Sequence, residues 1–219
     1  MPKVTYSDFI ESVNELGFLT PNMPNVVPGE QFWTNDPDTD PWLWKTRVAE
    51  EKKLIYGSFF NGKKGYIAPR FYSIFIDAFR PHKSMAERYE SGKLGQYEWK
   101  FWNLLENEGR ALGTHEYRSM LGVTAKDGRS ALDAAVIRLQ LTFDIVTTGN
   151  VDMLDKHGKP YNQSVAYNKV ENWMPQGWMD INPKMEHEEA IEAIYRQAEK
   201  IGADQKSFEK SLKLYKSYS

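Results

Sequence analysis

Between residues 113 and 173 the hydrophobic pattern changes its period, and this change restricts the fold more than any other feature. The short segment HEYRSMLG ends at Gly122, and a turn leads into RSALDAAVIRLQL, where apolar residues recur at helical spacing. The segments FDIVTTG and SVAYNKVENW then alternate apolar and polar residues around the turn DKHGKPYNQ, which predicts a β-hairpin. Two short helices followed by a hairpin is the plan of a winged helix-turn-helix. An α+β domain with no nucleic-acid role is the alternative.

Helices are predicted on both sides of this region. Residues 6–16 place apolar side chains at helical spacing, and Gly17 ends the segment. Further helices are expected over residues 70–79, 84–91, 94–108, 187–201 and 204–218. The expected fold is therefore α+β and mainly helical, with a winged helix-turn-helix element, a β-hairpin wing and flanking helices.

Three regions are expected along the chain. They are an N-terminal helical region with a Pro/Trp-rich loop (residues 1–110), a winged-helix region (residues 111–175) and a C-terminal helical pair (residues 176–219). The chain has 219 residues, of which 41% are hydrophobic, and no apolar run approaches the roughly 20 residues that span a bilayer. Its beginning lacks the pattern of a signal peptide. We expect a cytoplasmic protein with no membrane partner.

The stretch TNDPDTDPWLWK combines three aspartates with two prolines. Asp40 followed by Pro41 predicts the start of a helix that runs to about Tyr56, because the carboxylate caps free N–H groups and proline suits the first turn. The D-x-D-x-D spacing also resembles the start of a calcium-binding loop. However, Pro41 and Arg47 stand where such a loop has its turn glycine and bidentate glutamate. We therefore interpret the aspartates as capping and turn residues.

Signatures of metal, cofactor and covalent chemistry are missing from the sequence. The four histidines are scattered and follow no zinc-binding spacing, and there is no cysteine. No G-x-S-x-G motif is present. We expect no metal site and no cofactor.

Several segments carry a resemblance to a known family. ELGFLT, TDPWLWKTRVAEEKKLIYGSFFNGKKGYIAPRFYSIFIDAFR, SALDAAVIRLQLTFDIVTTG and KHGKPYNQSVAYNKVENW resemble a bacterial group described as AlkZ-related proteins. This resemblance covers roughly residues 5–175. The group is distantly similar to the AlkZ/YcaQ DNA glycosylases, which are built from tandem winged helices, so the resemblance implies a link to DNA repair.

The resemblance also implies where a catalytic pair would stand. Those glycosylases carry Gln-x-Gln or Gln-x-Asp shortly after a Gly-Leu-like pair, and the matching stretch here is GFLTPN. Thr20 and Asn22 therefore occupy the catalytic positions, and neither is a glutamine or a carboxylate. Hydrolysis of an N-glycosidic bond needs a group that positions water and stabilises an oxocarbenium-like charge. The other catalytic candidates in this loop are Gln31 and Asp38.

DNA contacts would fall on the second helix of the winged-helix region and on its wing. The candidates are basic residues: Lys126, Arg129, Arg138, Lys156, Lys159 and Lys169. Because the net charge of the chain is −2, affinity for phosphates requires several of them on one face. Aspartates in the same region nearly cancel their charge: Asp127, Asp133, Asp144, Asp152 and Asp155.

A second candidate site is an aromatic pocket formed by the Pro/Trp-rich loop and the helix after it. Its residues would be Trp33, Trp42, Trp44, Arg47 and Arg70. Aromatic rings with a few polar groups suit a flipped base or another planar ligand. In the alternative, the tryptophans hold a long loop on the core and the arginines pair with its aspartates.

Three functional hypotheses follow. The preferred one is a DNA-associated winged-helix protein that lacks the standard glycosylase pair and has double-stranded DNA as its partner. The second is an active glycosylase-like hydrolase that acts on alkylated bases. The third is a module that binds another protein and has no nucleic-acid role.

Overall fold

The computed structural model describes residues 4–20 and 35–213, and helices predominate in this part of the chain. The predicted class, α+β and mainly helical, is confirmed. The elements are α1 (Tyr6–Leu16), β1 (Phe18–Leu19), α2 (Pro41–Glu50), β2 (Ile55–Phe60), β3 (Lys63–Ile67), α3 (Pro69–Phe79), α4 (Met85–Glu90), α5 (Gln96–Glu108), β4 (Leu112–Gly113), α6 (Thr114–Met120), α7 (Arg129–Leu141), β5 (Ile145–Leu154), β6 (Pro160–Lys169), α8 (Val170–Trp173), α9 (His187–Lys200) and α10 (Gln205–Ser211).

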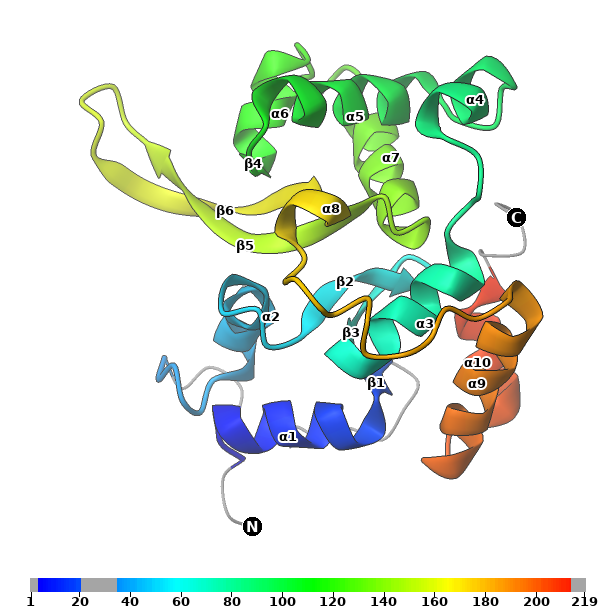
Figure 1. The fold of residues 1–219 in the computed structure, drawn as a ribbon. Coiled ribbons are helices and arrows are strands. Elements are labelled where there is room, and N and C mark those ends of the chain that lie inside the picture. The colour runs from blue at the N-terminus through cyan, green and yellow to red at the C-terminus, as the bar shows by residue number, and fades with distance from the viewer. Residues whose placement is uncertain (1–3, 21–34, 214–219) are drawn as a thin grey trace.

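The strands form two small antiparallel sheets with the same connectivity. Their strand orders are β1-β3-β2 and β4-β6-β5, so the last strand in sequence lies in the middle of each sheet. Each sheet consists of a two-residue edge strand and a hairpin, and a helix precedes that hairpin. In Figure 1 the first sheet lies in the lower half of the molecule and the second in the upper half.

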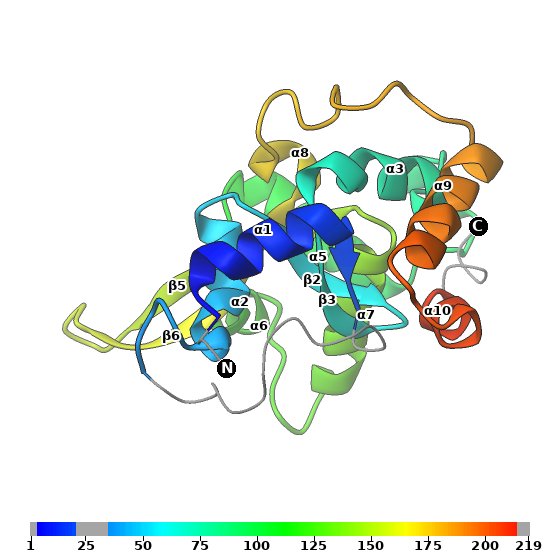
Figure 2. The same ribbon diagram turned by 90° about the horizontal axis from the view of Figure 1, so that it is seen from below.

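Each sheet has its own apolar core. The first core joins α1, α2 and the first sheet to α3, α9 and α10, and Phe18 is at its centre, packed against Phe60, Phe75 and Phe208. Figure 2 shows α9 and α10 next to each other at one side of α3. The second core lies between α4, α5, α6, α7 and the second sheet. Among the described helices, none combines the length and apolar character that crossing a membrane requires.

Helix α7 joins the two halves through one buried polar side chain. Gln140 is completely buried, and its Oε1 accepts a hydrogen bond of 3.0 Å from the backbone N–H of Ser58. Its Nε2 donates to the carbonyl of Val136 on the same helix. Strand β2 bulges between Gly57 and Phe60, so the Ser58 N–H is turned away from β3 and needs this side-chain acceptor.

A second connection joins α2 to the base of the long hairpin. The backbone N–H of Asn150 donates to Glu50 over 2.7 Å, and the Asn150 amide donates to Thr46 over the same distance. Gly149 has a φ of 128°, and a β-carbon there would overlap the Glu50 side chain. Glycine is therefore required where this hairpin meets α2.

The capping interpretation of the acidic cluster is confirmed. Asp40 precedes α2, and its carboxylate accepts hydrogen bonds from the N–H groups of Trp42 and Asn35. The predicted end of this helix near Tyr56 is wrong, because α2 stops at Glu50. Lys52 has a positive φ of 52°, which breaks the helix before β2 begins.

A hairpin that the sequence analysis missed follows α2. The sequence analysis predicts no strand in the segment FFNGKKGYIAP, but this segment contains the end of β2 and all of β3. Asn61 and Gly62 form the two-residue loop, with φ values of 55° and 77°. Strand β2 is buried on both faces and therefore shows no alternation of apolar and polar residues.

We predict that Gln140→Leu lowers the free energy of unfolding by about 1–3 kcal/mol, because it leaves the buried Ser58 N–H without an acceptor. Urea unfolding followed by circular dichroism measures the change. The matched control is Gln163→Leu on the exposed hairpin, which should change stability by less than about 0.5 kcal/mol. Equal losses in the two variants would show that Gln140 does not join the two halves.

Candidate nucleic-acid interface

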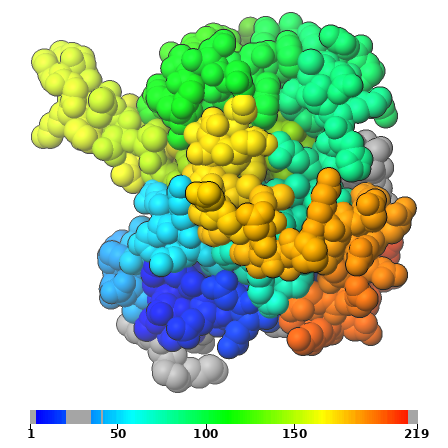
Figure 3. Space-filling model, in the orientation of Figure 1, coloured from blue at the N-terminus to red at the C-terminus, as the bar shows by residue number. Residues whose placement is uncertain are grey.

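The hairpin formed by β5 and β6 extends beyond the rest of the molecule, and Figure 3 shows it as a projecting arm. Its base is buried and its outer half is largely exposed. The Asp155 carboxylate holds the tip, since Oδ1 accepts hydrogen bonds of 2.8 and 2.9 Å from the N–H groups of His157 and Lys159. These hydrogen bonds fix the conformation of the turn, and with it the relative positions of the side chains at the tip.

The tip combines cationic and apolar side chains. Lys156 and Lys159 are exposed in its turn, and the large side chains of Leu154 and Tyr161 are 57% and 64% exposed. Ammonium groups bind phosphates, while apolar side chains at a hairpin tip can lie against the wall of a DNA groove. The structure therefore brings together two of the six predicted DNA-contacting residues and adds two apolar neighbours.

The start of α7 contributes further positive charge. Lys126 is exposed in the turn before this helix. Arg129 is half-exposed and lies 3.8 Å from Asp133, which also accepts a hydrogen bond of 2.6 Å from Arg118. The middle of α7 contacts α5 and β2, so its covered faces cannot enter a groove. The first turn of α7 and the loop before it are its most exposed part and are open to a nucleic acid.

The remaining two predicted DNA contacts lie elsewhere and are paired with carboxylates. Arg138 forms an ion pair with Glu98 of α5. Lys169 forms one with Glu106 and lies 4.6 Å from the ring of Trp102. Arg138 lies on α7 and Lys169 at the base of the hairpin, so neither is at the exposed tip, and their charges are partly neutralised.

The residues predicted to line an aromatic pocket do not all converge. Trp44 is fully buried, and its ring N–H donates to the carbonyl of Pro37. Arg47 donates to the same carbonyl, forms ion pairs with Asp38 and Glu51, and covers the ring of Tyr6. These contacts tie the segment before α2 to the core.

Arg70 and Trp42 lie apart from that group. Arg70 donates to the carbonyls of Asn14 and Glu15 at the end of α1, whereas Arg47 is beside Tyr6 at its beginning. Trp42 is 50% exposed, and the Lys45 ammonium lies 3.1 Å from its ring centre. The fifth predicted pocket residue, Trp33, lies outside the described residues.

The catalytic candidates occupy different environments. Thr20 follows β1 and is only 3% exposed. Asp38 is exposed, and its carboxylate lies 3.3 Å from the Arg47 guanidinium. Asn22 and Gln31 lie outside the described residues. Their catalytic roles stay predictions.

Sequence reasoning missed a pair of lysines near Thr20. Strands β1 and β3 pair Leu19 with Tyr66, so Thr20 comes next to the part of β3 that carries Lys64. The Lys64 ammonium lies 5.5 Å from the ring centre of Tyr56, and Lys45 approaches from α2. The dipeptide Asn61-Gly62 is typical of a two-residue hairpin loop and therefore predicts a strand after it. That strand is β3, and its register would have shown on which face of the sheet Lys64 lies.

The environment of this pair changes its acidity. Surrounding protein atoms lower the pKa of Lys64 to about 8, and repulsion from Lys45 adds to the decrease. Burial also lowers the pKa of Lys45 and raises that of Tyr56 to about 12. A lysine with a lowered pKa can accept a proton or attack a carbonyl group, and its charged form can bind an anion.

Fold and interface together define an α+β protein in which a projecting hairpin carries exposed cationic and apolar side chains. The chain belongs to the AlkZ-related family, since the model of that family, described as AlkZ related, matches residues 4–214. No curated protein and no solved structure gives a significant match to this sequence.

We predict that Lys64 reacts with an amine-acylating reagent at pH 7.5 about tenfold or more faster than Lys126, which is exposed like Lys64, because the lowered pKa of Lys64 leaves part of its amine neutral. Peptide mass spectrometry measures both rates in one sample, and the Lys64 rate should level off above about pH 8. Lys45→Gln should slow Lys64 alone, since it removes a repulsive charge. Equal rates for Lys64 and Lys126 would contradict the lowered pKa.

Proposed function

We propose that this protein binds double-stranded DNA through the tip of the β5–β6 hairpin and the loop before α7, without the standard glycosylase reaction. The projecting hairpin with exposed Lys156, Lys159, Leu154 and Tyr161 is the observation that carries this proposal. Membership of the AlkZ-related family supports a relationship to DNA repair.

The order of elements supports a winged helix over residues 96–169. Helix α5, strand β4, helices α6 and α7 and the β5–β6 hairpin follow one another, and β4 pairs with β6 as the third strand. We interpret this order as a winged-helix plan in which the hairpin is the wing. Because α5 and β2 cover parts of α7, the wing takes the larger share of the contact with DNA.

The proposed binding is electrostatic and does not depend on the base sequence of the DNA. Each lysine that neutralises a phosphate releases counterions, which makes affinity depend on salt. The tip carries no arginine, and the amides of Asn162 and Gln163 near it hydrogen-bond within the hairpin, to the Gln163 N–H and to Asp152. The bidentate contacts that read a base in the major groove are therefore not prepared there. The exposed Leu154 and Tyr161 side chains suit a minor groove, where apolar wedges reach between base steps.

The hydrolase hypothesis has less support. Thr20 and Asn22 stand at the positions that carry glutamine or aspartate in the resembling glycosylases, and a threonine hydroxyl is a poor general base. The described candidate Asp38 is turned toward Arg47 and solvent. The proposed role is therefore recognition of DNA.

We predict that the double substitution Lys156→Gln and Lys159→Gln weakens duplex binding and reduces the slope of log K against log salt concentration by about 2. Fluorescence anisotropy with a labelled duplex, between 50 and 200 mM salt, measures both quantities.

The control variant is Lys200→Gln with Lys206→Gln, which makes the same change in net charge on α9 and α10. It should leave the slope unchanged. If both double variants lose affinity equally, or the native protein does not bind duplex at low salt, the hairpin is not a DNA contact.

We predict that the native protein releases no base from alkylated duplex DNA, because the candidate catalytic positions carry Thr20 and Asn22. Alkaline gel analysis for abasic sites, alongside an active glycosylase, measures this. Strand breaks that appear with the native protein and disappear with Gln31→Ala or Asp38→Ala would establish the hydrolase hypothesis instead.

A further inference from the structure

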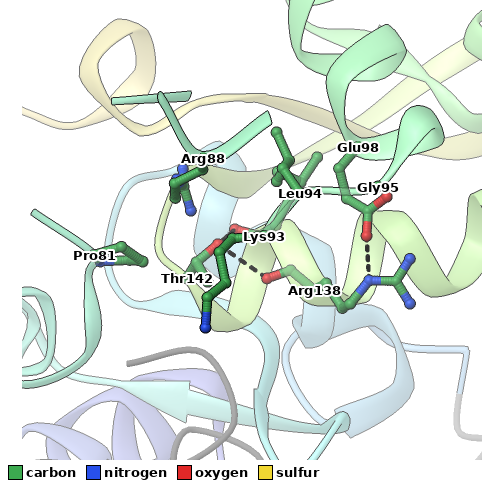
Figure 4. A pocket seen from close by; sticks show the side chains of 9 residues that line it. Pro81, Arg88, Lys93, Leu94, Gly95, Glu98, Arg138 and Thr142 are labelled. Atoms are coloured by element: carbon green, nitrogen blue, oxygen red, sulfur yellow. Dashed lines mark hydrogen bonds and ion pairs between the residues drawn. The ribbon is translucent and has the colours of Figure 1, made fainter. Parts of the chain in front are cut away.

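A cleft lies between the α3–α4 connection and α5. It consists of two hollows of about 250 and 470 Å³ that share Pro81 and Arg88. Small-molecule sites have volumes of roughly 300–1,000 Å³. The larger hollow is within this range and the smaller one is just below it. Figure 4 shows the smaller hollow, with side chains from α4, α5 and α7 around it.

The lining of the cleft carries more cationic than anionic side chains. Six cationic side chains line the two hollows: Arg80, Lys83, Arg88, Lys93, Arg138 and Lys169. Three carboxylates line them: Glu98, Asp144 and Glu171. Four of these cations form ion pairs, namely Arg80, Arg88, Arg138 and Lys169, the last with Glu106 outside the lining. Among the described residues, the excess positive charge of the cleft therefore comes from Lys83 and Lys93. A cleft that concentrates one sign of charge attracts ligands of the other sign.

Arg88 stands between the two hollows with an unused hydrogen-bond donor. It is 6% exposed, and its Nη2 donates to Asp144 over 2.7 Å. Its Nε is buried and has no hydrogen-bond partner in the described part of the chain. A buried donor without an acceptor costs about 1–3 kcal/mol, so an acceptor oxygen brought by a ligand would be bound favourably. In Figure 4 Arg88 and Lys93 are both among the side chains that surround the hollow, and the Lys93 ammonium extends away from Arg88.

Two tryptophans supply an aromatic surface in the larger hollow. Trp99 and Trp102 lie three residues apart on α5, and therefore on one face of the helix. Trp99 stacks on Tyr89 at 4.9 Å, and Lys169 lies 4.6 Å from the Trp102 ring centre. Both rings are fixed by these neighbours, and a fixed indole ring can stack on a planar group of a ligand.

We propose that this cleft binds a phosphorylated nucleoside, with Arg88, Lys83 and Lys93 around the phosphate and Trp102 in contact with the base. The phosphate oxygens accept hydrogen bonds from guanidinium and ammonium groups, and the base provides the planar surface that the indole ring requires. The ligand has two sources with this chemistry, a free mononucleotide and the 5′-phosphorylated end of a single strand. The proposal uses no residue of the hairpin tip and is independent of duplex binding.

Isothermal titration calorimetry of the full chain with AMP, adenosine and inorganic phosphate tests the site. AMP should bind more tightly than either of the other two, because only AMP carries both groups. Adenosine that binds as tightly as AMP would overturn the phosphate site. An oligonucleotide with a 5′-phosphate, compared with its 5′-hydroxyl form, distinguishes the two sources. The proposal is also overturned if neither AMP nor the phosphorylated strand binds at millimolar concentration.

Three variants locate the site. Lys83→Gln with Lys93→Gln changes only exposed side chains, so the fold should persist, and AMP affinity should fall about tenfold. Trp102→Leu should weaken AMP but leave inorganic phosphate unchanged. Lys200→Gln with Lys206→Gln is the charge-matched control and should bind AMP as the native protein does. Equal affinities in the lysine variant of the cleft and in the control would exclude this cleft as the site.

Discussion

The hydrogen bond from the Ser58 N–H to the buried Gln140 side chain is the constraint on which the arrangement of the two halves depends. It connects a bulged strand of the first sheet to α7, which belongs to the second core. Phe143, just after α7, adds a ring that stacks parallel to Phe59 at 5.2 Å. A buried amide accepts only a partner at the right distance and direction, so this contact fixes where α7 lies as well as how tightly it is held.

The fixed position of α7 decides which parts of the second half can meet a partner. Because α5 and β2 occupy its sides, a duplex can reach the loop before α7 and the long hairpin more readily than the middle of the helix. Gly149 and Asn150 hold the base of that hairpin against α2, so the arm is attached to both halves. The positive cleft beside Arg88 lies at another place and offers a different chemistry, with a recessed donor and aromatic walls.

The sequence predicted what depends on local patterns. The α1 helix, the cap at Asp40 and the β5–β6 hairpin follow from spacing, capping chemistry and alternation, and the structure confirms all three. The β2–β3 hairpin was missed because a strand buried on both faces lacks alternation, although Asn61-Gly62 marked its loop. Ion pairs such as Arg138 with Glu98 join distant residues, so no local pattern predicts them. The same is true of the cleft, whose walls come from segments that meet only in the folded chain.

Hydrogen–deuterium exchange of the native protein, with and without a saturating DNA duplex, distinguishes contact through the hairpin from contact through α7. Contact through the hairpin predicts slower exchange of backbone amides in residues 153–163 and in the loop before α7. It predicts no change in residues 132–141, which α5 and β2 already cover. Protection of residues 132–141 together with unchanged exchange in the hairpin would contradict it, because the duplex would then contact α7 and not the projecting arm.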